Sequence, residues 1–191
     1  MFIVVYNFKG GEGKSKIAAN LALTMDYSVV TNDIYSPIDN LFNEDKVMKL
    51  HPNDAMPDFD VTDNIIFDFG GYPDSRVVKI LEQAALVIVP ITNEEDNIQV
   101  GINTIDEIKN YTNQIVIVAN KTVKGDYEAI KQDVENYFTY PVFEIKKSTA
   151  VKRMSSSGKS IKSLASTGGL LSLHYSKISK QFDQLINHIN Q

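Results

Sequence analysis

Six short apolar runs restrict the folds that this chain can adopt. They are rich in Val and Ile, and most of them continue without an alternating polar residue, as in FIVVY at 2–6. A strand with this pattern is buried on both faces, which is typical of a parallel sheet. The expected strands span residues 2–6, 27–30, 64–69, 85–91, 114–120 and 140–145.

Amphipathic stretches lie between and after these runs. Strands that alternate with helices predict an α/β fold, with a mostly parallel sheet, helices on both faces and right-handed crossovers. The length of 191 residues suits a single domain, 1–191. The expected apolar helix faces are Ile17, Leu21 and Met25; Ile98, Ile102, Ile105 and Ile108; and, in a last helix from about Leu170, Ile178, Phe182, Leu185, Ile186 and Ile189.

Composition excludes several classes of protein. There is no cysteine, so disulfides, iron–sulfur ligands and a thiol nucleophile are excluded, and three scattered histidines do not suggest a histidine-based zinc site. The sequence contains no run of about 18 apolar residues, so it predicts no membrane span. The start of the chain lacks the basic region and cleavage site of a signal peptide. We therefore expect a cytoplasmic protein without a membrane partner.

The net charge of −5 conceals an uneven distribution. Residues 145–182 contain eight Lys or Arg and no Asp or Glu, whereas residues 1–144 hold 23 of the 24 acids and only 11 of the 19 bases. A basic region of this kind indicates either a polyanionic partner or a solvated basic face. Charge alone does not separate these two interpretations.

A glycine-rich loop, KGGEGKS at 9–15, follows the first expected strand and opens a helix. Its glycines let the backbone turn N–H groups toward an anion, and the helix adds its positive dipole end. Lys14 would reach terminal phosphates, and the Ser15 hydroxyl would bind Mg²⁺. The loop predicts a P-loop NTPase. The usual G-x-x-x-x-G-K-[ST] pattern differs in two respects, because Phe8 replaces its first glycine and Lys9 adds a second lysine.

These two differences match the K-G-G-x-G-K-[ST] loop of the ParA/MinD family of deviant Walker A ATPases. The chain resembles the small ParA-type plasmid and chromosome partition ATPases most, from residue 2 to about 165. The resemblance implies ATP and Mg²⁺ as cofactors, and an ATP-bound homodimer in which Lys9 acts on the partner's phosphates. The loop residues implied to bind nucleotide are Lys9, Gly10, Gly11, Glu12, Gly13, Lys14, Ser15 and Lys16.

Three polar residues after later strands extend the resemblance. Asp33 stands at the second acid of the family's D-x-D-P-Q, with Thr31 in place of the first, which implies a role in positioning the attacking water and Mg²⁺. Asp68 ends a buried strand, where a carboxylate can hold Mg²⁺ through water. Asn120 stands where family members contact adenine. The implied catalytic residues are Lys9, Lys14 and Asp33, and the implied metal residues are Ser15, Asp68 and Asp33.

Asp33 and Asn120 also have interpretations that involve no nucleotide. Asp33 is otherwise a loop acid without a role, and Asn120 a surface residue. The family's D-T-P or D-x-P after the Asp68 strand is replaced by Phe69-Gly70-Gly71. This departure, with Thr31, keeps open a nucleotide-switched adaptor that does not hydrolyse ATP.

Two other readings compete. A small GTPase would use Asp68 to Gly71 as D-x-x-G and Asn120-Lys121 as half of N-K-x-D, but Val123 at the fourth position cannot accept a hydrogen bond from guanine. A MinD-like positioning ATPase would cycle on membranes through a basic amphipathic tail, whereas this chain ends FDQLINHINQ.

The resemblance also gives the basic region at 145–182 an expected role. ParA-type dimers bind double-stranded DNA without sequence preference through C-terminal bases. The implied function is an ATP-dependent DNA segregation ATPase at the nucleoid, with weak intrinsic turnover, a stimulating ParB-like partner, and release from DNA on hydrolysis. The DNA contact candidates are Lys146, Lys147, Lys152, Arg153, Lys159 and Lys162.

Overall fold

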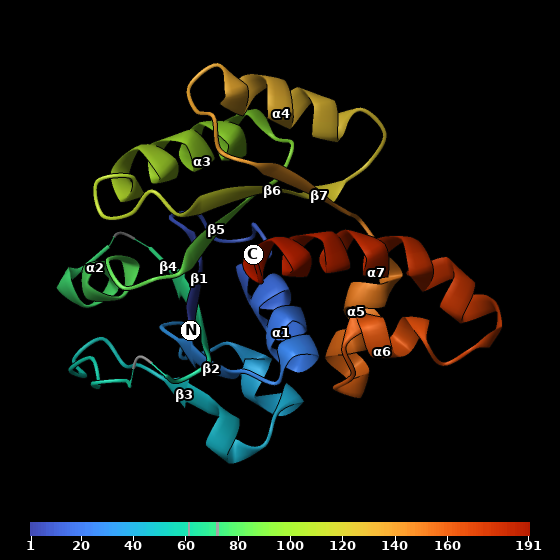
Figure 1. The fold of residues 1–191 in the computed structure, drawn as a ribbon, viewed down its shortest axis with the longest axis horizontal. Helices are drawn as coiled ribbons and strands as arrows, with labels where there is room; N and C mark the ends of the chain where they lie inside the picture. The colour runs from blue at the N-terminus through green and yellow to red at the C-terminus, as the bar shows by residue number, and fades with distance from the viewer. Residues whose placement is uncertain (61, 72) are drawn as a thin grey trace.

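The computed structural model describes residues 1–60, 62–71 and 73–191. In these residues, seven parallel strands form one sheet in the order β3-β2-β4-β1-β5-β6-β7, with helices on both faces (Figure 1). The expected α/β fold is confirmed. The strands are β1 (Phe2–Asn7), β2 (Ser28–Thr31), β3 (Val47–Lys49), β4 (Ile65–Gly70), β5 (Leu86–Ile91), β6 (Ile115–Thr122) and β7 (Val142–Lys146).

All six expected runs are strands, each shifted by at most two residues at either end. Strand β3 was not expected, because it is three residues long and half-exposed at the edge of the sheet, so it lacks an apolar run. The α-helices are α1 (Lys14–Met25), α2 (Ser75–Leu81), α3 (Glu95–Ile108), α4 (Asp126–Glu135), α5 (Thr149–Ser157), α6 (Ile161–Ala165) and α7 (Gly169–Ile189), with short 3-10 turns at Pro37–Leu41 and Glu44–Lys46.

Two apolar clusters cover the two faces of the sheet. Helices α2, α3 and α4 pack on one face, and α1, α5, α6 and α7 pack on the other (Figure 1). Along β1, Val4 and Tyr6 contribute to the first cluster, and Ile3 and Val5 to the second. Burial on both faces explains why the strand sequences are apolar without alternation. No helix of the described residues has the length and apolar character needed to cross a membrane.

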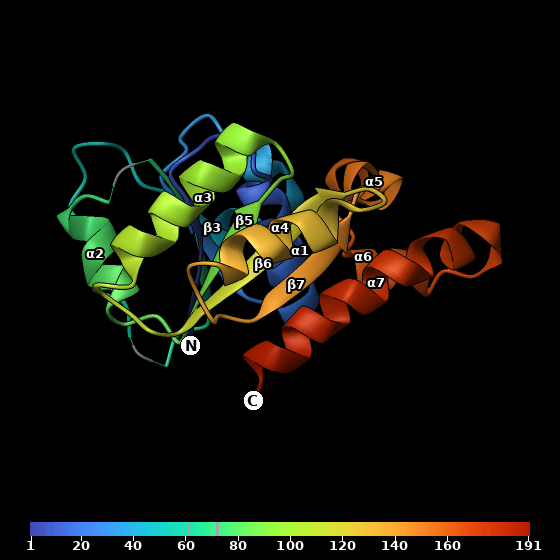
Figure 2. The ribbon, with the colours of Figure 1, turned by 90° about the horizontal axis from the view of Figure 1, so that it is seen from above.

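The last helix is only partly a core element. Its start projects beyond the edge of the sheet (Figure 2). There Leu170, Leu171 and Leu173 are 85%, 62% and 72% exposed. The buried face of α7 begins at Tyr175 and continues through the residues that the sequence predicts as its core stripe, with Leu185 fully buried.

These positions give a matched pair of leucines on one helix. We predict that Leu185→Ala lowers the free energy of unfolding by about 2–5 kcal/mol, because it leaves a cavity under α7. Leu173→Ala should change it by no more than about 0.5 kcal/mol, since the side chain is already in solvent. Urea denaturation of both variants measures the difference. Equal losses would contradict the packing of α7 on the sheet.

Candidate functional site

The glycine-rich loop joins β1, in the middle of the sheet, to α1. Gly11 and Gly13 have φ of +87° and +88°, a conformation that side chains rarely adopt. A Cβ on Gly13 would also lie 2.4 Å from Nδ2 of Asn120. Glycine is therefore required at position 13 both by the backbone conformation and by the close approach of β6.

Side-chain donors hold three carbonyl groups of this loop. Nζ of Lys14 donates to the Lys9 carbonyl at 2.7 Å, and Nζ of Lys121 donates to the Gly11 carbonyl at 2.5 Å. Nδ2 of Asn120 donates to the Glu12 carbonyl at 2.7 Å. The planar peptide sends each following N–H in the opposite direction from its carbonyl. These contacts therefore set the direction of the loop amides.

The backbone amides of residues 10 to 15 form a row at the start of α1. Among the described residues, none of these six N–H groups donates a hydrogen bond to the chain. A consecutive row of unused amides at a helix start is an anion-binding arrangement, since backbone N–H groups are otherwise almost always paired. The loop therefore fits a phosphate chain.

Glu12 is buried beneath the loop rather than directed at a ligand. It is 1% exposed, and its carboxylate accepts hydrogen bonds from the Thr92 amide at 2.7 Å and from Thr92 Oγ1 at 3.0 Å. Asn97 in turn donates to Thr92 Oγ1 at 2.6 Å. The side chain of Glu12 thus ties the phosphate loop to the end of β5. Only its amide belongs to the row that faces a ligand.

Asp68, the fourth residue of β4, is a buried carboxylate, 2% exposed. Oδ2 accepts a hydrogen bond of 3.4 Å from Thr31 Oγ1, whereas Oδ1 has no partner in the described part of the chain. Burial raises the pKa of Asp68 to about 6, against the opposing effects of the Ser15 hydroxyl and the Lys14 charge. An unpartnered buried oxygen beside Ser15 fits Mg²⁺ held through water.

Many of the expected site residues meet at one cavity of about 610 Å³. Lys14, Ser15, Lys16, Asp33 and Asp68 all line it, with the glycines of the loop. Burial lowers the pKa of Lys14, although nearby carboxylates, Asp68 foremost, act to raise it. The Lys14 ammonium and the carboxylates of Asp33 and Asp68 therefore line the cavity that the loop also borders.

A second cavity of about 410 Å³ adjoins the first along α1. Its walls are mostly apolar, with Ile17, Val151 and Phe182 among the lining residues. None of its described lining residues is an acid, so it offers no carboxylate to read guanine. Asn120 borders this cavity, but its amide already holds the Glu12 carbonyl, a structural role that sequence analysis did not foresee.

The other two lysines of the loop differ in position, because Lys16 also lines the cavity of Lys14 whereas Lys9 does not. Lys9 lines a third cavity of about 440 Å³ together with Thr92 and Asp126, and it does not line the cavity of Lys14. Lys16 is exposed and donates to Ser155 Oγ at 2.9 Å. Within one chain, the Lys9 side chain therefore does not join the phosphate cavity.

The expected DNA contacts are divided by the fold. Lys146, Lys147 and Lys152 line the apolar cavity beside the phosphate loop. Arg153 and Lys159 are exposed on α5 and the turn after it. The remaining candidate, Lys162, is exposed on α6 and pairs with Asp183 at 3.4 Å. The six candidates therefore do not share one environment.

The fold and this site define a P-loop nucleotide-binding protein, and comparison with known proteins gives its family. Residues 3–161 match the model of the CobQ/CobB/MinD/ParA nucleotide binding domain, so the chain belongs to that family. It is an ATPase of the ParA/MinD type that uses ATP and Mg²⁺, as the sequence predicts. No curated protein sequence matches it.

Solved structures share the fold at low sequence identity. The ATP complex of a Cyanothece McdA variant has a TM-score of 0.70 at 11% identity, over 99% of this chain and 96% of that one. MinD of Pyrococcus furiosus has a TM-score of 0.61 at 16% identity, over 96% and 98%. A putative plasmid partition protein of Borrelia burgdorferi, bound to AMPPNP, has the same score and identity, over 98% of each chain.

The raised pKa of Asp68 predicts that its charge destabilises the nucleotide-free protein. The folded pKa of about 6 exceeds the unfolded value of 3.8, so the penalty is complete above pH 6 and disappears below pH 3.8. Asp68→Asn should therefore raise the free energy of unfolding at pH 7.5 by about 2–3 kcal/mol. This gain should shrink as the pH falls from 6 to 4.

Denaturation in EDTA without nucleotide, at pH 7.5 and pH 4.5, measures this gain. Asp63→Asn, in an exposed turn, is the matched control and should show no such pH-dependent gain. An Asp68→Asn variant less stable than its parent at pH 7.5 would contradict the electrostatic account of the site.

Proposed function

We propose that the chain is an ATP-dependent DNA segregation ATPase of a plasmid or chromosome. The observation that carries this proposal is the placement of two loop lysines. Lys14 lines the phosphate cavity, while Lys9 lines a separate cavity with Thr92 and Asp126. That division suits a dimer in which each Lys9 serves the nucleotide of the other chain.

The two adjoining cavities suggest where ATP lies. The phosphates would occupy the 610 Å³ cavity on the amides of residues 10 to 15, with Lys14 turned from the Lys9 carbonyl to the phosphate oxygens. Adenine would occupy the apolar 410 Å³ cavity. Ser15, with Asp68 and Asp33 through water, would hold Mg²⁺, which neutralises phosphate charge when bound.

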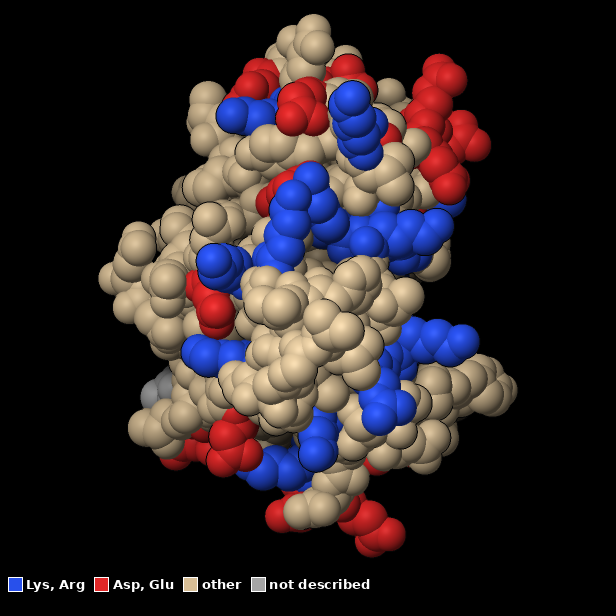
Figure 3. Space-filling model, turned by 90° about the vertical axis from the view of Figure 1, so that its right-hand side faces the viewer, with Lys and Arg blue, Asp and Glu red and all other residues tan. Residues whose placement is uncertain are grey.

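DNA contact is proposed for the exposed bases of α5 and the following turn. Figure 3 shows this side of the molecule, with Lys and Arg side chains in separate groups around an uncharged projection. Arg153 and Lys159 remain for DNA when Lys146, Lys147 and Lys152 border the nucleotide. One chain offers few bases, and a dimer would present twice as many to DNA. This doubling supports a protein that binds DNA only in its ATP-loaded, dimeric state.

The ATPase cycle follows from this dependence. ATP would drive homodimerisation and non-specific binding to double-stranded DNA at the nucleoid, and hydrolysis would release the dimer. Turnover by the isolated chain would be weak, because Lys9 is supplied only on dimerisation. A centromere-binding ParB-like partner would stimulate it.

A MinD-like positioning ATPase is the second candidate. The observation that favours it is a group of exposed leucines at the start of α7, because apolar side chains do not bind the charged phosphates of a DNA backbone. These leucines are Leu170, Leu171 and Leu173. Such a protein would also switch by ATP-driven dimerisation. It would differ in binding a cargo or surface other than DNA.

Lys9 gives the test of the dimer. Lys9→Ala should leave ADP binding by the monomer unchanged within about twofold, because the side chain lies outside the phosphate cavity. It should abolish dimerisation with a slowly hydrolysed ATP analogue. Without the Lys9 ammonium, the phosphate charges bound to the two chains would repel each other across the interface. Sedimentation velocity, with ADP and with the analogue, measures the fractions of monomer and dimer. Lys124→Ala, at an exposed lysine after β6, is the control. Normal dimerisation of Lys9→Ala would refute action in trans.

DNA binding is tested by reversing charge outside the nucleotide cavities. Arg153→Glu with Lys159→Glu should weaken binding of the ATP-loaded protein to any duplex by at least tenfold at low salt. Lys109→Glu with Lys131→Glu makes the same change in charge and should have little effect, because Lys109 caps the C-terminus of α3 and Lys131 lies on α4, on the opposite face of the sheet. Fluorescence anisotropy with two unrelated duplexes gives the affinities. If no variant, parent included, binds DNA, the positioning function is favoured instead.

A further inference from the structure

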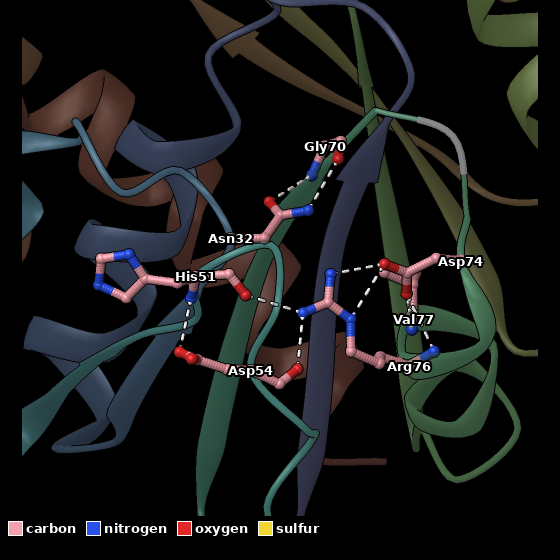
Figure 4. A network of polar contacts seen from close by, with 7 residues as sticks. All are labelled: Asn32, His51, Asp54, Gly70, Asp74, Arg76 and Val77. Carbon is pink, nitrogen blue, oxygen red and sulfur yellow. Dashed lines mark hydrogen bonds and ion pairs between the residues drawn. The ribbon is translucent and has the colours of Figure 1, made fainter.

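A pair of hydrogen bonds joins Asn32, just after β2, to Gly70, the last residue of β4, and both residues border the phosphate cavity. Nδ2 of Asn32 donates to the Gly70 carbonyl at 2.8 Å, and Oδ1 of Asn32 accepts from the Gly70 amide at 3.0 Å (Figure 4). Strands β2 and β4 are parallel neighbours with Thr31 opposite Asp68. The Asn32 amide therefore continues the pairing of these strands beyond the end of β2, with a side chain in place of backbone.

Gly70 is in direct contact with the phosphate-binding lysine. A Cβ on Gly70 would lie 2.9 Å from Cε and 3.1 Å from Nζ of Lys14. Its backbone thus forms the surface against which the Lys14 side chain rests. The contact that fixes the Gly70 peptide also fixes this surface.

The other end of the pair carries Asp33, the next residue after Asn32. The Asp33 amide donates to Thr31 Oγ1 at 3.1 Å, and its carboxylate accepts from the Tyr35 amide at 3.1 Å. Asp33 is exposed and lines the same cavity as Lys14. Because Asn32 is anchored on Gly70, the backbone of Asp33 is held relative to β4.

We infer that Asn32 is a positioning residue for ATP hydrolysis. It holds Asp33 and Gly70 at a fixed separation across the cavity proposed for the terminal phosphates. Both polar groups of its side chain are engaged with Gly70, so it acts through Gly70 and Asp33 rather than on the nucleotide. The inference rests on the proposed placement of ATP in this cavity.

A second network secures the chain just beyond this pair, and it serves as a control. Arg76 pairs with Asp74 at 2.6 Å and donates to the carbonyls of His51 and Asp54, each at 2.9 Å (Figure 4). It anchors the start of α2 to a distant loop without touching Gly70. Loss of this network should loosen the fold locally and leave the pair between Asn32 and Gly70 intact.

The experiment compares steady-state ATP hydrolysis by Asn32→Ala, Asn32→Gln and Arg76→Gln with that of the parent chain. Active sites are counted by the stoichiometry of ADP binding in calorimetry, and melting temperatures are recorded. Asn32→Ala removes both hydrogen bonds to Gly70 and should lower kcat per site roughly tenfold, with the ADP affinity unchanged within twofold. Asn32→Gln, which keeps the amide, should recover part of kcat. Arg76→Gln should lower the melting temperature but keep kcat per site.

The outcomes separate this inference from the placement on which it rests. An unchanged kcat per site in Asn32→Ala, or an equal fall in Arg76→Gln, would overturn the positioning role while leaving the nucleotide site in place. If the parent chain binds no ADP, the placement of the nucleotide fails and the inference fails with it. If Asn32→Ala does not fold, a kcat per site of Asn32→Gln equal to that of the parent, with the two hydrogen bonds lost in its crystal structure, would overturn the role.

Discussion

Six consecutive backbone amides, for which the described part of the chain offers no acceptor, are the constraint on which this site depends. Such a row is unfavourable unless an anion or water pairs with it, so the surrounding structure must hold the loop in place. It does so through the carbonyls, which accept from Lys14, Lys121 and Asn120, and through the buried carboxylate of Glu12. These anchors come from α1, β6 and the end of β5. The sheet order places those strand ends beside the loop.

The charged side chains of the cavity suit one anionic and one cationic ligand. Without nucleotide, burial raises the pKa of Asp68 and lowers that of Lys14, so each group is pushed toward its neutral form. A phosphate beside Lys14 and a cation beside Asp68 would reverse both effects. The same desolvation that disfavours the charges of Asp68 and Lys14 would strengthen their electrostatic contacts with Mg²⁺ and ATP.

Sequence analysis predicted the sheet and the phosphate loop because both are local patterns. Lys14, Ser15, Asp33 and Asp68 converge as expected, since parallel strands bring their carboxyl ends to one edge. The buried face of α7 was also readable from its periodicity. The exposed leucines before it were not, because a helical repeat does not show where the supporting sheet ends.

The contacts that hold the site were not predictable, because they join residues far apart in the chain. Glu12 meets Thr92 across 80 residues, and Asn32 meets Gly70 across 38. Nothing within the loop sequence marks Glu12 as buried, and Asn32 lies in an irregular segment. Lys146 and Lys152, two of the predicted DNA contacts, also border a cavity, which a run of bases in the sequence does not show.

The account rests on the claim that the loop amides and Lys14 together bind the phosphates of ATP. Calorimetric titration of Mg²⁺-ATP into the parent chain and into Lys14→Ala tests it most directly. The account predicts one site per chain in the parent and an affinity at least tenfold lower in the variant, because a charge-assisted hydrogen bond contributes about 1.5–3 kcal/mol. A variant that binds ATP as tightly as the parent would contradict it.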